Sequence, residues 1–449
     1  MHGTSSPASR RDPTAAELIA ARPHLSPHPL DGLLLEGVPL AAIAAALGTP
    51  TYVYSETAIR CRYAALAAAL GAAGLKAEIR YAVKANDHVA ILRVLGRLGA
   101  GMDVVSEGEL ARALHAGIDA KRMVFSGVGK SGPELARALA AGIGQINVES
   151  AEELAELSAI ASRLGQTAPV ALRVNPDVDA GTHTKISTGR AQDKFGIPAG
   201  EIPSLYAHAT TLPGIVPVGL AVHIGSQVMA LAPFRRSFEV LARLAGRLRA
   251  AGLPLRRLDC GGGLGIGYAN EPAPLVAGLA GALGVSCRDL GLELIVEPGR
   301  WLVGHAGLLL ATVIRVKPGP ERPFVILDAG MNDLLRPALY EAWHGIVPLG
   351  PKNAGPQNCD SGNGGRADIV GPICESADRF ARDRALASLS AGDRVAILDA
   401  GAYGRVMAST YNGRPLAAEA MVSGERWATI RPRQPLEALW AEERLPDWP

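Results

Sequence analysis

The run Glu78–Asn86, EIRYAVKAN, has the composition of a buried strand but ends close to a lysine, Lys84. Seven more apolar runs of strand type follow along the chain, namely GMDVVS, RMVFSG, QINVES, VALRVNP, GLAVHIG, RLDCGGG and LELIVEPGR. Runs with helical periodicity, such as EGELARALHAGI and FEVLARLAGRLRAAG, lie between them. Eight strands that alternate with helices predict an α/β fold, in which a (βα)8 TIM barrel closes a parallel sheet.

Changes in hydrophobic periodicity and composition along the sequence predict the domain boundaries. The barrel is predicted over residues 55–308. Beyond it, runs such as LLLATVIRVK, FVILDAG, ADIVGPICES, RVAILDAGAY and RWATIRP read as β segments separated by Gly- and Pro-rich turns, so a mainly-β, Greek-key or sandwich-like domain is expected over 309–449. Residues 30–54 are expected to add strands to that domain. Residues 1–29 are predicted to be a mobile tail, and the insert 350–365 a surface loop.

Composition narrows the function. The chain has 449 residues, with 45 Lys and Arg against 43 Asp and Glu. This near-neutral balance lacks the excess of positive charge expected of a nucleic-acid-binding protein and favours a small-molecule site. Five cysteines without paired CxxC spacing argue against a disulfide framework and a structural zinc site, and fit a reducing cytoplasm. We expect neither a secretory signal nor a membrane span, because no long apolar run occurs. No His and carboxylate cluster has metal-ligand spacing, so no metal is expected.

Polar residues gather at one end of the predicted strands. This end is the face at which such barrels place their chemistry, and a single polar strand end would carry no information because loops are polar anyway. The residues at or just past the strand ends are Lys84, Ser106, Ser126, Glu149, Asn175, His223, Gly261, Gly262, Gly263 and Glu297.

Pyridoxal phosphate explains four of these features together. A phosphate requires backbone N–H groups free of side chains, as Gly261–Gly263 would offer, with Ser226 as a further donor. An aldehyde cofactor needs an amine to hold it as a Schiff base, which is the interpretation of Lys84, and a flat neighbour, which His223 can be. A Glu297 carboxylate about 4 Å from the ring nitrogen is worth roughly 4 kcal/mol, or on the order of three pKa units. Such a partner favours carbanion-forming reactions.

Each side chain alone has a plainer interpretation. An isolated Lys84 would be a surface residue whose stem lies along apolar neighbours, and an isolated His223 a core histidine. Cys374 beside Ile373 would be a small core residue, and Arg336 a surface arginine. The functional interpretation of these residues therefore depends on their occurring together in one sequence.

The motifs as a set resemble those of the diaminopimelate decarboxylases, which are fold type III pyridoxal phosphate enzymes of the alanine racemase-like class, related to the class 2 ornithine, lysine and arginine decarboxylases. The resemblance runs from about residue 48 to about residue 415. It rests on YAVKAN, GMDVVSEGEL, LRVNPDVDAGTHTKISTGRAQDKFGI, HIGSQ, DCGGGLGI, EPGR, DAGMNDLLRPALYEAWH, GPICESAD, DAGAYG and YNGRP.

The resemblance implies a role for each matching residue. Lys84 would hold the cofactor and His223 would stack on its ring, while Cys374 would return a proton to the carbanion. The remaining cofactor-binding positions would be Ser226, Gly261, Gly262, Gly263, Glu297, Pro298, Gly299, Arg300 and Tyr403. The substrate-binding positions would be Arg300, Arg336 and Tyr340 for the distal carboxylate, Glu375 for the distal ammonium, and Tyr403.

The resemblance also implies a reaction and an assembly. The reaction is decarboxylation of meso-2,6-diaminopimelate at its D centre to L-lysine and CO2, the last step of bacterial lysine synthesis. In this family the second domain of one subunit completes the barrel site of the other, so a homodimer with shared sites is expected. The loop NPDVDAGTHTKISTGRAQDKFG is long for a βα connection and would serve as a lid.

Four alternatives remain open at this point. A decarboxylase of ornithine, arginine or carboxynorspermidine should lack the distal-carboxylate residues Arg300, Arg336 and Tyr340. A racemase of this fold would present Arg, not Glu297, to the ring nitrogen. A non-catalytic, regulatory protein that binds pyridoxal phosphate would be expected to lose Lys84 or Cys374. A metal-dependent barrel hydrolase would need ligand clusters.

Overall fold

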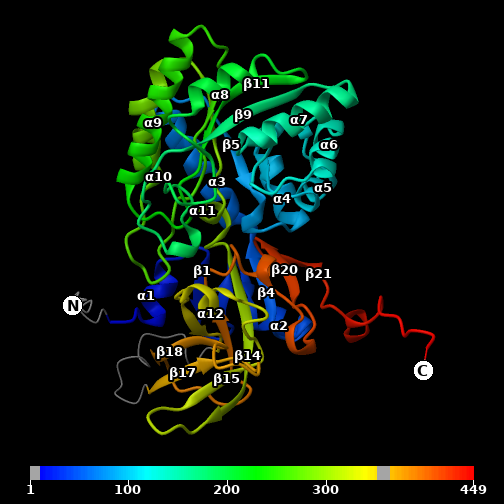
Figure 1. Cartoon of the computed structure of the whole chain (residues 1–449). Helices are drawn as coiled ribbons and strands as arrows, with labels where there is room; N and C mark the ends of the chain where they lie inside the picture. Colours follow the sequence, from blue (N-terminus) through cyan, green and yellow to red (C-terminus); the bar gives the residue numbers. More distant parts are fainter. Residues whose placement is uncertain (1–10, 351–364, 449) are drawn as a thin grey trace, which may run out of the picture.

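The computed structural model describes residues 11–350 and 365–448. Figure 1 shows two lobes, an α/β lobe drawn above a lobe made mainly of strands. The first ten residues and residues 351–364, which include nearly all of the insert expected to be a surface loop, lie outside the described part.

The α/β lobe is a closed barrel of eight parallel strands, as predicted. Each strand pairs with the next, β8 pairs with β9, and β13 pairs with β5 to close the ring. A two-residue strand, β10 (Ile197–Pro198), pairs with β9 outside the ring. The eight strands are β5 (Ala77–Ala82), β6 (Gly101–Val104), β7 (Met123–Phe125), β8 (Gln145–Val148), β9 (Ala168–Asn175), β11 (Ile215–Val222), β12 (Arg257–Asp259) and β13 (Glu293–Val296).

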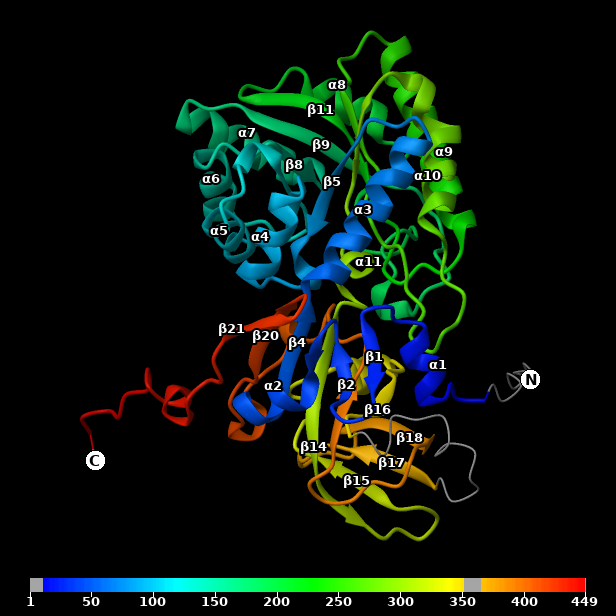
Figure 2. The ribbon, with the colours of Figure 1, turned by 180° about the vertical axis from the view of Figure 1, so that it is seen from behind.

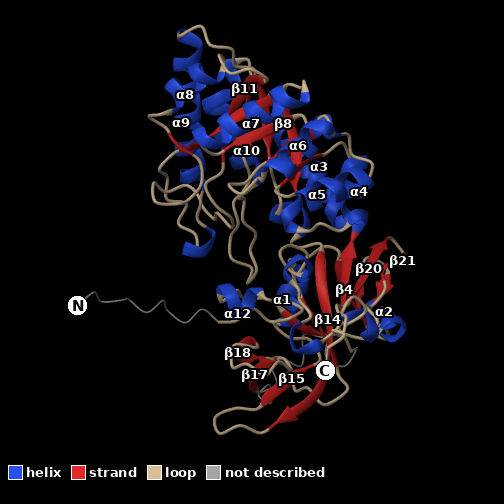
Figure 3. Cartoon of the chain, turned by 45° about the vertical axis from the view of Figure 1, so that its right-hand side comes forward, coloured by secondary structure: helices blue, strands red, loops and turns tan. Residues whose placement is uncertain are grey.

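Helices surround this ring (Figure 3). Several begin at a capping serine: the side chains of Ser106 and Ser150, which closely follow β6 and β8, accept a hydrogen bond from a first-turn N–H, and Ser131 forms a capping box with Glu134. These helices are α3 (Glu56–Ala72), α4 (Val89–Arg97), α5 (Glu107–His115), α6 (Gly132–Ala140), α7 (Ala151–Leu164), α8 (Ile202–Ala209), α9 (Leu231–Ala250), α10 (Val276–Cys287) and α11 (Arg300–Val303).

The second lobe is a mixed nine-stranded sheet that joins distant parts of the chain. Its path runs β18-β17-β15-β14-β4-β20-β21, with β19 pairing both β14 and β16. Figure 2 shows the early strand β4 beside the late strands β20 and β21. The members are β4 (Thr51–Ser55), β14 (Gly307–Lys317), β15 (Phe324–Leu327), β16 (Ile346–Pro348), β17 (Arg366–Val370), β18 (Arg379–Ala385), β19 (Arg394–Ile397), β20 (Ala418–Ser423) and β21 (Arg426–Arg431), and a short helix α12 (Arg336–Tyr340) follows β15.

The N-terminal segment departs from its prediction. A mobile tail through residue 29 is wrong for residues 14–28, because Thr14 and Glu17 form a capping box on α1 (Ala15–Ala20) and β1 (Leu25–His28) follows it. Leu18, Ile19 and Leu25 are buried in a second hydrophobic core beside the large sheet. Their burial outweighs the Pro- and Ala-rich composition that suggested disorder.

Residues 30–54 add only one strand to the large sheet. β4 pairs with β14 and β20. In contrast, β2 (Gly32–Leu35) and β3 (Val38–Pro39) form a separate three-stranded sheet with β1, followed by α2 (Leu40–Leu47). This small sheet packs against the β lobe through apolar side chains.

Candidate active site

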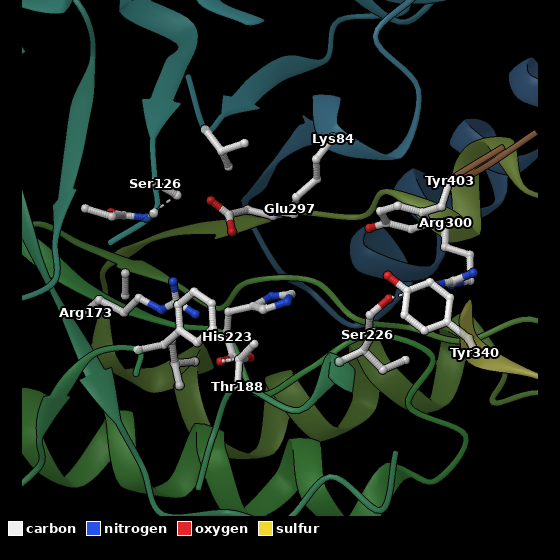
Figure 4. Close-up of a pocket in the computed structure, with 17 residues that line it drawn as sticks. Lys84, Ser126, Arg173, Thr188, His223, Ser226, Glu297, Arg300, Tyr340 and Tyr403 are labelled. Carbon is white, nitrogen blue, oxygen red and sulfur yellow. Dashed lines mark hydrogen bonds between the residues drawn. The ribbon is translucent and has the colours of Figure 1, made fainter. Parts of the chain in front are cut away.

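A cavity of about 320 Å³ opens at the carboxyl ends of the barrel strands. In Figure 4 Lys84, Glu297 and His223 lie near its middle, with Arg173 towards one end and Arg300, Tyr340 and Tyr403 towards the other. The polar residues that line it are Lys84, Ser126, Asn147, Arg173, Thr188, His223, Ser226, Glu297, Arg300, Tyr340 and Tyr403. The barrel and the β lobe therefore both contribute to one chamber.

Lys84 lies in a 3-10 turn, Val83–Ala85, directly after β5. Its Nζ donates to Oδ2 of Asp103 on β6 at 2.8 Å. Burial alone would lower the pKa of Lys84, but the negative charges of Asp103 and other neighbours raise it above its ordinary value. The amine is therefore a protonated, carboxylate-bound group in this structure, and it must lose a proton before it can act as a nucleophile.

Glu297 presents a buried carboxylate to the cavity. Its Oε1 has no hydrogen-bond partner among the residues that the structure describes. Burial, together with the charges of Asp103 and Asp259, raises the pKa of Glu297 well above its ordinary value. A buried acceptor without a partner is costly, so this position fits a cationic donor such as a protonated pyridine nitrogen.

His223 follows β11 and is held in one orientation. Its Nδ1 accepts a hydrogen bond from the N–H of Gly262 at 3.2 Å. Burial and the nearby charges of Lys84 and Arg173 lower the pKa of His223 well below its ordinary value, so the ring is neutral with its proton on Nε2. A neutral flat ring beside Glu297 suits the face of an aromatic cofactor.

The glycine turn 261–263 is required by close approach of neighbouring strand ends. A Cβ at Gly262 would lie 1.9 Å from the carbonyl oxygen of Glu297, and one at Gly263 2.2 Å from that of Gly225. Gly263 also has a φ of +103°. Any side chain would therefore push apart the turns that carry His223 and Glu297. Gly261 and Gly262 border a separate, smaller cavity lined mainly by apolar side chains, while Ser226 lines the main one.

The turn Pro298–Arg300 brings an arginine to the cavity. The carbonyl of Pro298 accepts from the N–H of Ala82, so this turn is tied to the end of β5, near Lys84. Arg300 is buried, and its guanidinium donates to Tyr268 Oη at 2.6 Å and to Ser226 Oγ at 3.0 Å. Arg300 is thus fixed by neutral oxygens and not by a carboxylate.

The β lobe brings three of the predicted residues to the same end. Tyr340 lines the cavity, and Tyr403 is held there by its N–H, which donates to Ala85 O at 2.8 Å. Arg336 is buried behind Tyr268, with its Cζ 4.4 Å from the Tyr268 ring centroid and its Nη1 2.7 Å from His344 Nε2. Burial lowers the pKa of Arg336 from its ordinary value.

Cys374 and Glu375 are not brought to this cavity by their own chain. Both are exposed on the β lobe. The N–H of Cys374 donates to Asn412 Oδ1 at 3.1 Å, and the carboxylate of Glu375 accepts from the hydroxyl of Tyr411. They form a polar surface cluster away from Lys84.

The loop after β9 forms one wall of the cavity. Ile186, Thr188 and Phe195 line the chamber, and Lys185 Nζ donates to Leu339 O in α12 at 3.0 Å. The loop therefore touches the β lobe beside Tyr340. This placement is what a lid would need.

Some of the polar residues predicted at strand ends form hydrogen bonds or ion pairs that hold helices and loops of the barrel in place. Ser106 caps α5, Glu149 pairs with Arg173 at 2.6 Å, and Asn175 donates to Arg190 O and Phe195 O in the loop after β9. Ser126 lines the cavity.

Sequence reasoning overlooked Asp103, Arg173 and Tyr268. The signal for the first two was a charge within an apolar strand, in GMDVV and VALRVN. No comparable signal marked Tyr268, because its neighbours come from distant segments.

The fold and the site define a class of protein. A closed parallel barrel with a lysine, a histidine, a glycine turn and a buried glutamate at its carboxyl face is the arrangement expected of a pyridoxal phosphate enzyme. In agreement, residues 56–304 match the family described as pyridoxal-dependent decarboxylase, pyridoxal binding domain.

Longer comparisons identify the family more closely. The diaminopimelate decarboxylase of Pseudomonas aeruginosa is 48% identical over 92% of this chain and 97% of its own length. The Helicobacter pylori enzyme of that name, solved with L-lysine, superposes with a TM-score of 0.84 at 40% identity over 90% of this chain and 98% of its own. The M. jannaschii enzyme, also solved with L-lysine, superposes with a TM-score of 0.88 at 35% identity over 95% of this chain and 98% of its own. This chain belongs to the diaminopimelate decarboxylase family.

Proposed function

We propose that this chain catalyses the pyridoxal phosphate-dependent decarboxylation of meso-2,6-diaminopimelate to L-lysine and CO2. The observation that carries the proposal is the pair of Arg300, which lines one end of the cavity, and Arg336, which lies behind Tyr268. Both guanidinium groups are buried, their hydrogen-bond partners are Tyr268, Ser226 and His344, and neither forms an ion pair with a carboxylate in residues 11–350 or 365–448. Two buried cations without an anion favour a substrate that carries a carboxylate remote from its reacting centre.

The residues present fit the cofactor. Glu297 offers an orphaned buried acceptor, His223 a neutral ring, Lys84 an amine, and Ser226 with Gly261–Gly263 a turn free of side chains. Pyridoxal phosphate, when bound, supplies an electron sink for the pair released as the bond to CO2 breaks. We assign Lys84, His223, Ser226, the glycine turn, the segment Glu297–Arg300 and Tyr403 to its binding.

Each residue then has a defined task. The Glu297 carboxylate keeps the proton on the ring nitrogen, which maximises the pull on electrons. Asp103 orients the Lys84 amine and accepts its proton as the amine becomes a nucleophile. Arg300, Arg336 and Tyr340 bind the distal carboxylate, so that the carboxylate to be lost lies at the other end of the substrate, towards Lys84.

The acid that protonates Cα comes from a second copy of the chain in this proposal. Cys374 and Glu375 are exposed and are not among the residues that line the cavity of their own chain, which is the placement that residues serving a partner's site require. Cys374 would donate the proton and Glu375 would bind the distal ammonium. Because this role needs a free thiol, we place the reaction in the reducing cytoplasm.

The test is a substrate panel. The purified protein, supplied with pyridoxal phosphate, is incubated separately with meso-diaminopimelate, DL-ornithine and DL-arginine, and amine products are identified by mass spectrometry. We expect lysine from the first and little amine from the others. Putrescine or agmatine formed as fast as lysine would contradict the proposal, since those substrates lack the distal carboxylate.

A further inference from the structure

Tyr268 stands between the two arginines that the proposed function assigns to the substrate. It lies just beyond the glycine turn and is 5% exposed. The Arg336 Cζ is 4.4 Å from its ring centroid and the Arg300 Cζ is 5.9 Å from it. Its hydroxyl accepts the 2.6 Å hydrogen bond from Arg300, and the ring meets His344 edge-on at 5.2 Å.

Tyr268 is the side chain that contacts both arginines, since the other partners serve one each: Ser226 and the Tyr403 ring, 4.6 Å from Cζ, contact Arg300, and His344 contacts Arg336. The Nε of each is buried without an acceptor in the described part of the chain. Burial lowers the pKa of Arg336, and the positive charge of Arg300 lowers it further, so the two buried cations repel each other. An electron-rich ring face against one guanidinium and a hydroxyl oxygen against the other offset that repulsion.

The backbone of Tyr268 is itself anchored from outside the barrel. Its carbonyl accepts from Arg22 Nη2 at 3.0 Å, and its N–H donates to Glu271 Oε1 at 3.0 Å. Arg22 also donates from Nε to Asp399 Oδ1, at 2.9 Å, at the end of β19. One buried side chain after α1 therefore fixes the loop that carries Tyr268 to the β lobe that carries Arg336.

We propose that Tyr268 is a positioning residue that holds Arg300 and Arg336 at the spacing needed to bind one carboxylate together, and so makes the site selective for ligands with a distal carboxylate. The inference rests on the proposed function, because it takes these arginines as the carboxylate-binding pair. Tyr268 acts through the arginines: its hydroxyl sets the direction of Arg300, and its ring fixes the position of Arg336.

The experiment compares two ligands that differ by one carboxylate. L-Lysine carries the group, and pentane-1,5-diamine lacks it. Binding of each to the cofactor-loaded protein is measured by calorimetry for the wild type and for Tyr268→Phe, which keeps the ring and removes the hydroxyl. We expect Tyr268→Phe to weaken L-lysine binding about tenfold, as for a lost hydrogen bond to a charged group, and to leave diamine binding within about twofold.

Matched variants complete the test. Tyr206→Phe removes a similarly buried hydroxyl, which donates to Pro254 O at 2.7 Å away from the cavity, and should change neither affinity. Tyr268→Leu should weaken L-lysine binding further than Tyr268→Phe. If that variant does not fold, judged by thermal unfolding, Tyr268→Phe alone decides the question.

The outcomes separate the two proposals. Suppose that the wild type binds L-lysine more tightly than the diamine, and that Tyr268→Phe weakens the binding of both ligands equally or of neither. That result would overturn the role of Tyr268 and leave the proposed function standing. A wild type that binds the diamine as tightly as L-lysine would overturn both, because no carboxylate would then be recognised.

Discussion

At the scale of single residues, the site is defined by charges that the fold leaves incompletely matched. Lys84 has Asp103 as its partner, whereas Glu297 keeps a free buried oxygen and the guanidinium groups of Arg300 and Arg336 have no carboxylate within the described residues. Groups of this kind are expensive to bury unless a ligand completes them. The free acceptor suits a protonated ring, and the free donors suit a carboxylate.

The first prediction concerns Lys84. Replacing it with alanine removes the amine proposed to bind the cofactor, so the visible absorbance and the product trapped by borohydride should disappear, and turnover should fall at least about a thousandfold. Lys185→Ala, an exposed lysine in the loop after β9, serves as the control and should retain both signals. A Lys84→Ala protein that is still yellow and still trapped by borohydride would remove Lys84 from this role.

The second prediction concerns acid and His344. Burial, followed by the charge of Arg336, lowers the pKa of His344 from 6.5 to about 3. Below about pH 6.5 this histidine binds a proton in the unfolded chain but stays neutral in the folded chain. The free energy of unfolding should therefore fall as the pH drops towards 3, by up to about 1.4 kcal/mol per pH unit from this residue.

The measurement is denaturant unfolding at pH 7, 6 and 5 for the wild type and His344→Gln. The wild type should lose more stability over this range than the variant does. Equal losses in the two proteins would show that His344 carries a proton in the folded state.

At the scale of elements, the barrel strands were predictable because each is a short apolar run that ends in a polar or glycine-rich turn. Lys84, His223 and Glu297 could be proposed for the same reason, since strand ends in a barrel converge. Strands β16, β18 and β20 were missed: the first has three residues, the second reads RFARDRA, and the third is rich in alanine. Asp103 and Tyr268 gain their importance only from partners brought close by folding.

The third prediction belongs to α1 and the segment after it. Arg22 is 2% exposed and donates to Asp399 and to the carbonyl oxygens of Leu18 and Tyr268. Arg22→Met leaves the Asp399 carboxylate buried without its guanidinium partner, next to the ring of His305, and should cost about 3–5 kcal/mol of unfolding free energy.

The control is Arg11→Met, which breaks an exposed ion pair with Glu17 and should cost at most about 1 kcal/mol. Urea unfolding measures both. Equal, small effects would mean that the N-terminal segment is not anchored as described.

At the scale of the whole molecule, the two lobes divide the chemistry. The barrel supplies Lys84, His223 and Glu297 to the chamber, and the β lobe supplies Tyr340 and Tyr403 to it, with Arg336 buried behind Tyr268. The same lobe presents Cys374 and Glu375 outward. Only the family resemblance suggested a role for these last two, because their proposed site lies on another copy of the chain and no spacing or periodicity within one chain points to it.

The fourth prediction follows from that arrangement. Lys84→Ala and Cys374→Ala subunits, each nearly inactive alone, should regain up to about a quarter of wild-type activity when unfolded together and refolded as mixed dimers, because half of the dimers would carry one intact site. Mixed dimers that are confirmed by tags and stay inactive would show that the site is not shared.

The central claim is that the arginine pair selects a second carboxylate, and one comparison tests it directly. D-Lysine matches the reacting end of meso-diaminopimelate and lacks only the distal carboxylate. The ratio of kcat/KM for meso-diaminopimelate to that for D-lysine, measured with wild-type protein by release of CO2, should be at least about 10⁴, because D-lysine leaves buried donors unpaired. A ratio near one would contradict the account.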